Sequence, residues 1–146
     1  MEDFFKDIFE YHHHMNQTLI DVFLKHHQQL SERTPVMFSH CLNAHQIWNS
    51  RILETTPFEV YQIHPLENFK IIDTINYRTT IKIIDTFDFE EPIVYLNSNA
   101  EPFENTVQDI LFHIANHHTH HKGQLISDLR RFGIKPPVTD YIFHKR

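Results

Sequence analysis

The stretch that decides the fold is VQDILFHIANHHTHHKGQLISDLRRF, residues 107–132. Its apolar residues recur at the spacings expected for one face of an α-helix. This apolar stripe consists of Val107, Ile110, Ile114, Leu125, Leu129 and Phe132. The predicted helix begins near Asn105-Thr106 and ends before Gly133, because the later pair Pro136-Pro137 forbids its continuation.

Histidines crowd the middle of this helix, with five of them between residues 113 and 121. A projection of about 100° per residue places His121 near the centre of the stripe, His117 about 40° to one side and His118 about 60° to the other. His113 and His120 fall towards the edge. Two imidazoles one turn apart on one helical face can bind a single metal ion. The projection leaves both His117 and His118 as possible partners of His121.

A second helix, predicted from Thr34-Pro35 to about residue 54, offers a third imidazole. Its core face is marked by Met37, Cys41, Ala44 and Trp48. His40 lies inside this face and His45 on its shoulder. Three neutral imidazoles suit a divalent ion such as zinc, nickel or iron, and three protein ligands leave one coordination position open.

The remaining segments predict two more long helices and a small hairpin. The spacing of Phe5, Ile8, His12, Met15, Leu19 and Phe23 predicts a helix over residues 3–29. Residues 55–64 indicate a loop, and residues 65–86 a helix despite their many isoleucines and threonines. Residues 92–96, followed by Asn97-Ser98-Asn99, are typical of a hairpin. The fold predicted is all-α: an antiparallel up-down four-helix bundle with a long crossover and a hairpin insertion.

Composition narrows the possible functions. A length of 146 residues with 40% hydrophobic content favours a single domain over residues 1–146. The net charge of -6, with no Lys/Arg cluster longer than a pair, argues against a nucleic-acid partner. No apolar run approaches the roughly 18 residues of a membrane span, and the N-terminus does not resemble a secretion signal. One cysteine, Cys41, excludes an intramolecular disulfide, so we expect a cytoplasmic protein.

The histidines favour a metal over ordinary core packing. Fourteen histidines in this length is several times the usual number. Burying several imidazoles without a shared partner leaves donors and acceptors unpaired, at roughly 1–3 kcal/mol each. A metal ion shared between them relieves that cost. A single inward histidine such as His12, by contrast, is more typical of a hydrogen-bonded core residue.

Two segments resemble the motifs of a known family. Residues 116–125, NHHTHHKGQL, resemble the NHxxxHRGQ signature of the DinB family, also called DinB/YfiT-like. Residues 39–51, SHCLNAHQIWNSR, resemble its helix-two motif, a histidine followed by alanine, tryptophan and arginine. The resemblance implies a bundle with a crossover between helices two and three. One departure from the family pattern is Lys122, at a position where the family commonly has arginine. Lysine keeps the positive charge but lacks the two-pronged hydrogen-bonding geometry of a guanidinium.

The resemblance also implies a ligand set: a metal held by His40, His117 and His121. It thereby selects His117 rather than His118, and His40 rather than His45. His12, Asn116 and Gln124 are candidates for orienting these ligands from behind. No catalytic side chain is identified by the sequence.

The function implied is that of a metal-dependent enzyme. Relatives include S-transferases and isomerases that use low-molecular-weight thiols such as bacillithiol or mycothiol, and proteins described as metal-dependent hydrolases. We therefore expect one divalent ion whose open position activates a thiol or a water molecule. The alternative is a non-catalytic metal-binding or stress-associated interaction module, which a fourth protein ligand would favour.

A homodimer is also expected. The first predicted helix carries Phe4, Phe5, Phe9, Tyr11 and Phe23 on more than one face. Some of these rings would then bury against a second copy of the chain. DinB relatives are often homodimers, which supports the same expectation.

Overall fold

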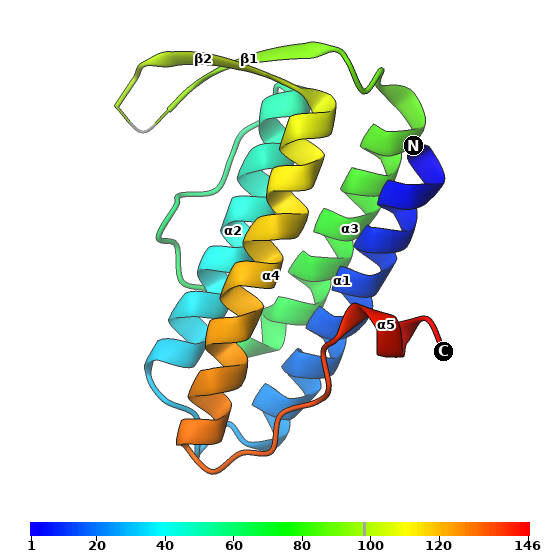
Figure 1. The fold of residues 1–146 in the computed structure, drawn as a ribbon. Helices are drawn as coiled ribbons and strands as arrows, with labels where there is room; N and C mark the ends of the chain where they lie inside the picture. The colour runs from blue at the N-terminus through cyan, green and yellow to red at the C-terminus, as the bar shows by residue number, and fades with distance from the viewer. Residues whose placement is uncertain (98) are drawn as a thin grey trace.

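The structure, a computed structural model, describes residues 1–97 and 99–146. Within these residues the chain is mostly helical, and its four long helices lie side by side (Figure 1). They are α1 (Glu2–Lys25), α2 (Arg33–Leu53), α3 (Phe69–Thr86) and α4 (Val107–Arg131). A short 3-10 turn, η1 (Leu66–Asn68), precedes α3, and a short helix, α5 (Tyr141–His144), lies near the C-terminus. Among the described residues, no helix combines the length and apolarity needed to cross a membrane.

A small sheet joins α3 to α4. Strands β1 (Pro92–Leu96) and β2 (Pro102–Thr106) are antiparallel, with Pro92 paired to Thr106 and Leu96 to Pro102. The hairpin lies across one end of the long helices, as Figure 1 shows. This confirms the hairpin expected from the sequence. Ser98, which was part of the predicted turn, lies outside the described residues.

The long connection between α2 and α3 sets the helix directions. It returns along the molecule, so that α3 begins at the same end as α2 (Figure 1). α1 packs mainly on α3, and α2 packs on both α3 and α4. The pairs α1/α3 and α2/α4 are antiparallel, whereas the neighbours α2 and α3 run in the same direction. The predicted crossover between α2 and α3 is therefore present. The predicted up-down alternation is wrong, because the connection runs back along α2, and α3 then runs in the same direction as α2.

Two predicted boundaries need correction. Residues 26–29 form turns, so the first helix ends at Lys25 rather than near Gln29. Thr34 is not the N-cap of α2 but its second residue, and its hydroxyl donates to the Asp128 carboxylate at 2.6 Å. The predicted start of α4 is confirmed, because Thr106 and Asp109 form a reciprocal capping box there.

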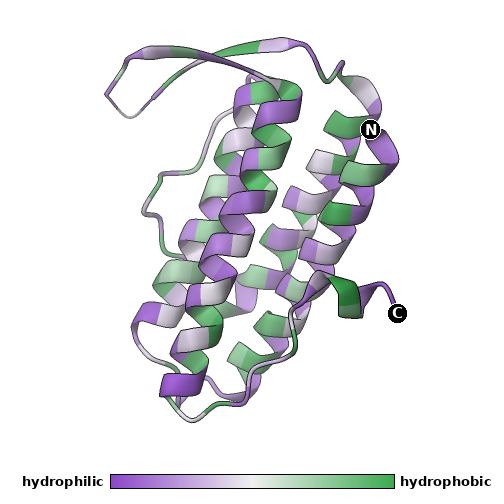
Figure 2. Ribbon diagram, viewed as in Figure 1, coloured by the Kyte–Doolittle hydropathy of each residue, from purple (hydrophilic) through white to green (hydrophobic). Residues whose placement is uncertain are grey.

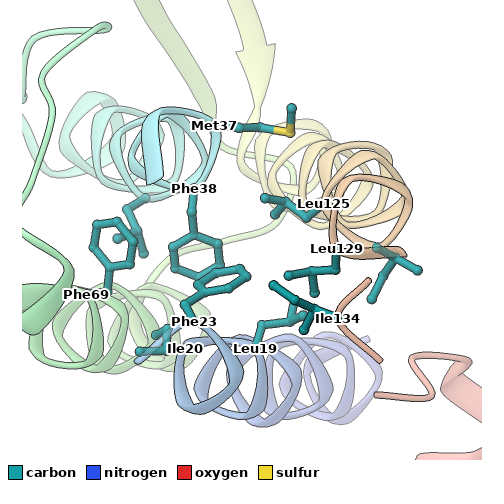
Figure 3. Packing of buried hydrophobic residues seen from close by; sticks show 11 residues of the cluster. Leu19, Ile20, Phe23, Met37, Phe38, Phe69, Leu125, Leu129 and Ile134 are labelled. Carbon is teal, nitrogen blue, oxygen red and sulfur yellow. The ribbon is translucent and has the colours of Figure 1, made fainter. Parts of the chain in front are cut away.

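The core consists of two apolar clusters, one towards each end of the helices. Hydrophobic and hydrophilic residues alternate along each helix (Figure 2), as this packing requires. The cluster shown in Figure 3 contains Leu19, Ile20, Phe23, Met37, Phe38, Leu42, Phe69, Leu125, Ile126, Leu129 and Ile134. The cluster nearer the hairpin contains Phe5, Phe9, Ile52, Ile83, Ile84, Ile93, Val107, Ile110, Leu111 and Ile114.

Between the two clusters lies a polar layer to which all four long helices contribute. We use this name for the buried side chains of His12, Asn16, His45, Asn49, Asp73, Asn76, Thr80, His118 and Lys122. Each helix thus has a polar break in its apolar stripe at the same level. Buried polar groups require partners, and this layer is the part of the core in which hydrogen bonding decides the packing.

Most aromatic residues of α1 enter the core of the single chain. Phe5, Phe9, Tyr11 and Phe23 are buried, whereas Phe4 is 59% exposed. One chain therefore has room for four of these five rings, and the homodimer expected from the fifth stays a prediction. The four helices offer faces on two sides of α1, and only Phe4 points clearly away from them.

Candidate metal centre

Three imidazoles from two neighbouring helices converge at one point. α2 supplies His40, and α4 supplies His117 and His121 one turn apart. Each ring has a nitrogen within 4.8 Å of those of the other two, and each side chain is half-buried. His117 Nε2 and His121 Nε2 are 3.1 Å apart. Two nitrogens bound to one tetrahedral ion at about 2.0–2.1 Å would lie about 3.3 Å apart, so this spacing suits a shared ion.

Gln124 fixes the tautomer of His121. The Nδ1 of His121 lies 2.8 Å from Gln124 Oε1, and an amide oxygen can only accept. Nδ1–H must therefore donate, which leaves the lone pair on Nε2, the nitrogen that faces His117. This is the arrangement by which a partner behind a histidine orients a metal ligand.

The surroundings favour neutral imidazoles. Burial lowers the pKa of His117 to about 3, and the adjacent His121 and His40 rings act in the same direction. Burial also lowers the pKa of His121, although the hydrogen bond to Gln124 opposes the shift. A histidine must be neutral to bind a metal, so both rings are in the required form at neutral pH.

One buried nitrogen of the cluster lacks a partner. His40 Nδ1 is inaccessible and has no hydrogen-bond partner among the described residues. An unpaired buried nitrogen is costly, and a protein usually keeps one only where something else satisfies it. The three imidazoles together therefore fit a divalent ion that prefers nitrogen ligands, such as zinc, nickel or iron.

A cavity of about 490 Å³ opens beside this cluster. His40 and His117 lie in its wall. The other residues that line the cavity are Ala44, Ile47, Trp48, Arg51, Val60, Tyr61, Tyr95, Asn97 and Phe103. A ligand of small-molecule size could thus reach the point where the three nitrogens converge.

The other buried histidines belong to the polar layer rather than to this cluster. His45 Nε2 lies 2.7 Å from the Thr80 hydroxyl, and His45 Nδ1 lies 3.1 Å from His118 Nε2. His45 and His118 are 4% and 3% exposed, so the prediction that His45 lies on the shoulder of its helix was wrong. They are core residues whose rings hydrogen-bond to each other.

Lys122 joins the same layer from α4. Its Nζ donates to the Tyr11 hydroxyl at 2.9 Å and to His12 Nδ1 at 3.3 Å, and Tyr11 donates on to the carbonyl of Thr139. Burial lowers the pKa of Lys122 to about 7. The side chain is only 5% exposed, which removes it from any anion that approaches through solvent.

The three residues expected behind the ligands lie in different places. Gln124 contacts His121, as described above. His12 is buried in the polar layer, where it contacts Lys122. The ring centroids of His12 and His118 are 5.4 Å apart. Asn116 is exposed. Only Gln124 touches one of the three converging histidines.

The apolar stripe predicted for the fourth helix does not include Leu111 and Ile126, so it does not predict the polar layer. Both are buried, while Phe132 is 42% exposed. Including the two residues rotates the centre of the stripe towards His118 and Lys122, which continue it at spacings of three and four. Counting every apolar residue of the helix would therefore have revealed that these two side chains point inward.

Cys41 does not belong to the cluster. It is a buried free cysteine, and burial raises the pKa of its thiol to about 12. The thiol is therefore protonated at neutral pH and serves as a small apolar group. Its neighbour in sequence, His40, points to the other histidines.

Comparison with known proteins identifies the family. The model of the DinB family matches residues 36–146, a range that contains all three converging histidines. No curated protein and no solved structure matches the chain. Since the match covers well over half of the sequence, the chain belongs to the DinB family.

Proposed function

We propose that the chain is a metal-dependent enzyme of the thiol S-transferase or hydrolase type. Its four long helices would form a DinB/YfiT-like bundle that holds one divalent ion through His40, His117 and His121. The observation that carries the proposal is the convergence of three ring nitrogens, within 4.8 Å of one another, at the wall of a 490 Å³ cavity. A bound divalent ion would supply Lewis acidity, which lowers the pKa of a coordinated thiol or water molecule.

The protein side chains have distinct tasks in this proposal. Gln124 holds the His121 ring so that its Nε2 lone pair faces the other ligands. The burial of His117 keeps that ring neutral and ready to bind. Trp48, Tyr61 and Phe103 supply apolar walls that bind the body of a substrate and exclude bulk water.

The coordination number distinguishes an enzyme from a structural site. Among the described residues, the group within ligand distance contains three side chains, and no fourth His, Cys, Asp or Glu joins it. Structural zinc sites are usually closed by four protein ligands, whereas catalytic sites keep one position for water or substrate. Three ligands beside a cavity therefore favour catalysis over a purely stabilising metal.

Metal content is the first test. We expect about one ion per chain after dialysis against zinc, and loss of that ion in His40→Ala, His117→Ala and His121→Ala, since two imidazoles seldom retain a divalent ion. His27→Ala, at an exposed histidine outside the cluster, is the matched control and should keep the ion. Elemental analysis after mild chelation gives the readout. Equal metal content in all five proteins would refute the ligand set.

Activity is the second test. The zinc-loaded protein should consume a small thiol in the presence of an electrophile, or hydrolyse an activated ester, at a rate that His40→Ala abolishes. A protein that binds zinc through these histidines yet accelerates neither reaction would support the non-catalytic alternative instead.

A further inference from the structure

The cavity beside the histidines continues past Arg51. A second cavity of about 320 Å³ lies next to the first, and the two share lining residues. The shared residues are Ile47, Arg51, Val60, Tyr95 and Asn97. We call the combined space the α2 cleft, since it lies between α2, the connection that follows it and the hairpin. The three-histidine cluster is at one end of this cleft, and Arg51 lies where the two cavities meet.

The α2 cleft differs in charge from the rest of the protein. The chain has 19 acidic residues and a net charge of -6. None of the described residues lining the cleft is Asp or Glu, and Arg51 is its single Lys or Arg. An anion repelled by most of the surface would therefore meet a cation here.

Arg51 is held in place but its charge is not neutralised. Its guanidinium carbon lies 4.1 Å from the ring centroid of Trp48 and 4.4 Å from that of Tyr95. One nitrogen donates to the Leu96 carbonyl at 3.4 Å. No carboxylate of the described chain lies within 4.0 Å of the guanidinium. A guanidinium has five N–H donors, so most of them remain available to a ligand.

Partial burial makes an anion at this position more favourable. Burial lowers the pKa of Arg51, which means that the charged form has lost some of its water. A cation stripped of water is stabilised by a paired anion. The two aromatic rings fix the plane of the guanidinium, so little side-chain freedom is lost when a planar oxyanion binds to its edge.

We infer that the α2 cleft binds a small organic anion, with a carboxylate on Arg51 and an apolar body directed along Val60, Tyr61 and Phe103 towards the three histidines. As a substrate class this rests on the proposed function, because the reacting group would be the part of the molecule that reaches His40 and His117. Binding to Arg51 itself does not require a metal. The two ideas can therefore fail separately.

Trp48 provides a direct probe of binding. It is the sole tryptophan of the chain, it lines the cleft, and Arg51 lies over its ring. We would titrate the protein with hexanoate and with the neutral isostere hexanamide, following Trp48 fluorescence, without metal and then with zinc. Hexanoate should bind roughly tenfold more tightly than hexanamide, because charge-assisted hydrogen bonds to a guanidinium are the stronger kind.

Three variants separate the causes. Arg51→Met should weaken hexanoate binding roughly tenfold and leave hexanamide binding unchanged. Arg51→Lys keeps the charge but loses the bidentate geometry, so its affinity for hexanoate should lie between those of Arg51→Met and wild type. Arg78→Met, exposed on α3, is the matched control and should bind as wild type does. Circular dichroism and thermal unfolding establish that each variant is folded.

Several results would overturn the inference. These are equal affinity of wild type for the two probes, no saturable signal with hexanoate, or unchanged hexanoate binding by Arg51→Met. Loss of hexanoate binding in His40→Ala would also overturn it, since the carboxylate would then be bound at the histidines. Retention by His40→Ala, together with no zinc binding by wild type, would support the Arg51 site and refute the proposed metal function.

Discussion

Acid should destabilise this protein through the polar layer, and His45 gives the clearest test. Thr80 donates its one hydroxyl proton to Asn49 Oδ1 at 3.0 Å or the Asn76 carbonyl at 3.1 Å. It must therefore accept from Nε2–H of His45. Nδ1 of His45 then accepts from Nε2–H of His118. Protonation of His45 at Nδ1 would make two N–H groups, one on each ring, face each other where one hydrogen bond now forms.

The magnitude follows from the burial of this ring. Burial lowers the pKa of His45 from 6.5 to about 4. Between these values the unfolded chain carries a proton on this ring and the folded chain does not, so stability is present above pH 6.5 and is lost as the pH falls towards 4. Each pH unit costs about 1.4 kcal/mol, so a change from pH 7.5 to pH 5.0 removes about 2 kcal/mol. Burial lowers the pKa values of His12 and His118 as well, which acts in the same direction.

The assay is urea unfolding of wild type and His45→Gln at pH 7.5 and pH 5.0, with a chelator present to remove metal. Glutamine keeps a donor for Thr80 but cannot titrate. The loss of unfolding free energy between the two pH values should be about 2 kcal/mol smaller in the variant, whatever its absolute stability. His27→Gln, at an exposed position, is the control. An identical pH dependence in wild type and His45→Gln would refute the reasoning.

Three further outcomes test the fold and assembly. Phe38→Ala should lower the free energy of unfolding by about 3–5 kcal/mol, because it leaves a cavity in the cluster of Figure 3, whereas Phe112→Ala, 61% exposed, should change it little in the same urea titration. Thr106→Ala should cost about 1 kcal/mol in chemical denaturation through loss of the capping box, and an unchanged midpoint would contradict that role. We propose a homodimer, so light scattering at micromolar concentration should give twice the chain mass; a single-chain mass would exclude it.

The sequence alone predicted the long helices well. Apolar spacing, the Thr106 cap and the paired prolines after Gly133 are local features, and they place α4 within one or two residues. The three converging histidines were also predicted. Helix projection left His118 as an alternative to His117, and the resemblance to the DinB family removed it. Both kinds of information are carried by short segments, which is why they can be read without a fold.

The tertiary structure decided how those segments meet. The spacing within α2 and α3 does not encode their relative direction, which depends on the path of the connection between them. The burial of His45 and His118 depends on Thr80, a residue of α3 that no local pattern links to either. Likewise the place of Arg51 in a cleft depends on Tyr95 of the hairpin, 44 positions later in the chain. Local sequence fixes which face of a helix is apolar, but contacts between distant segments determine which polar side chains find partners within it and which remain free to bind a ligand.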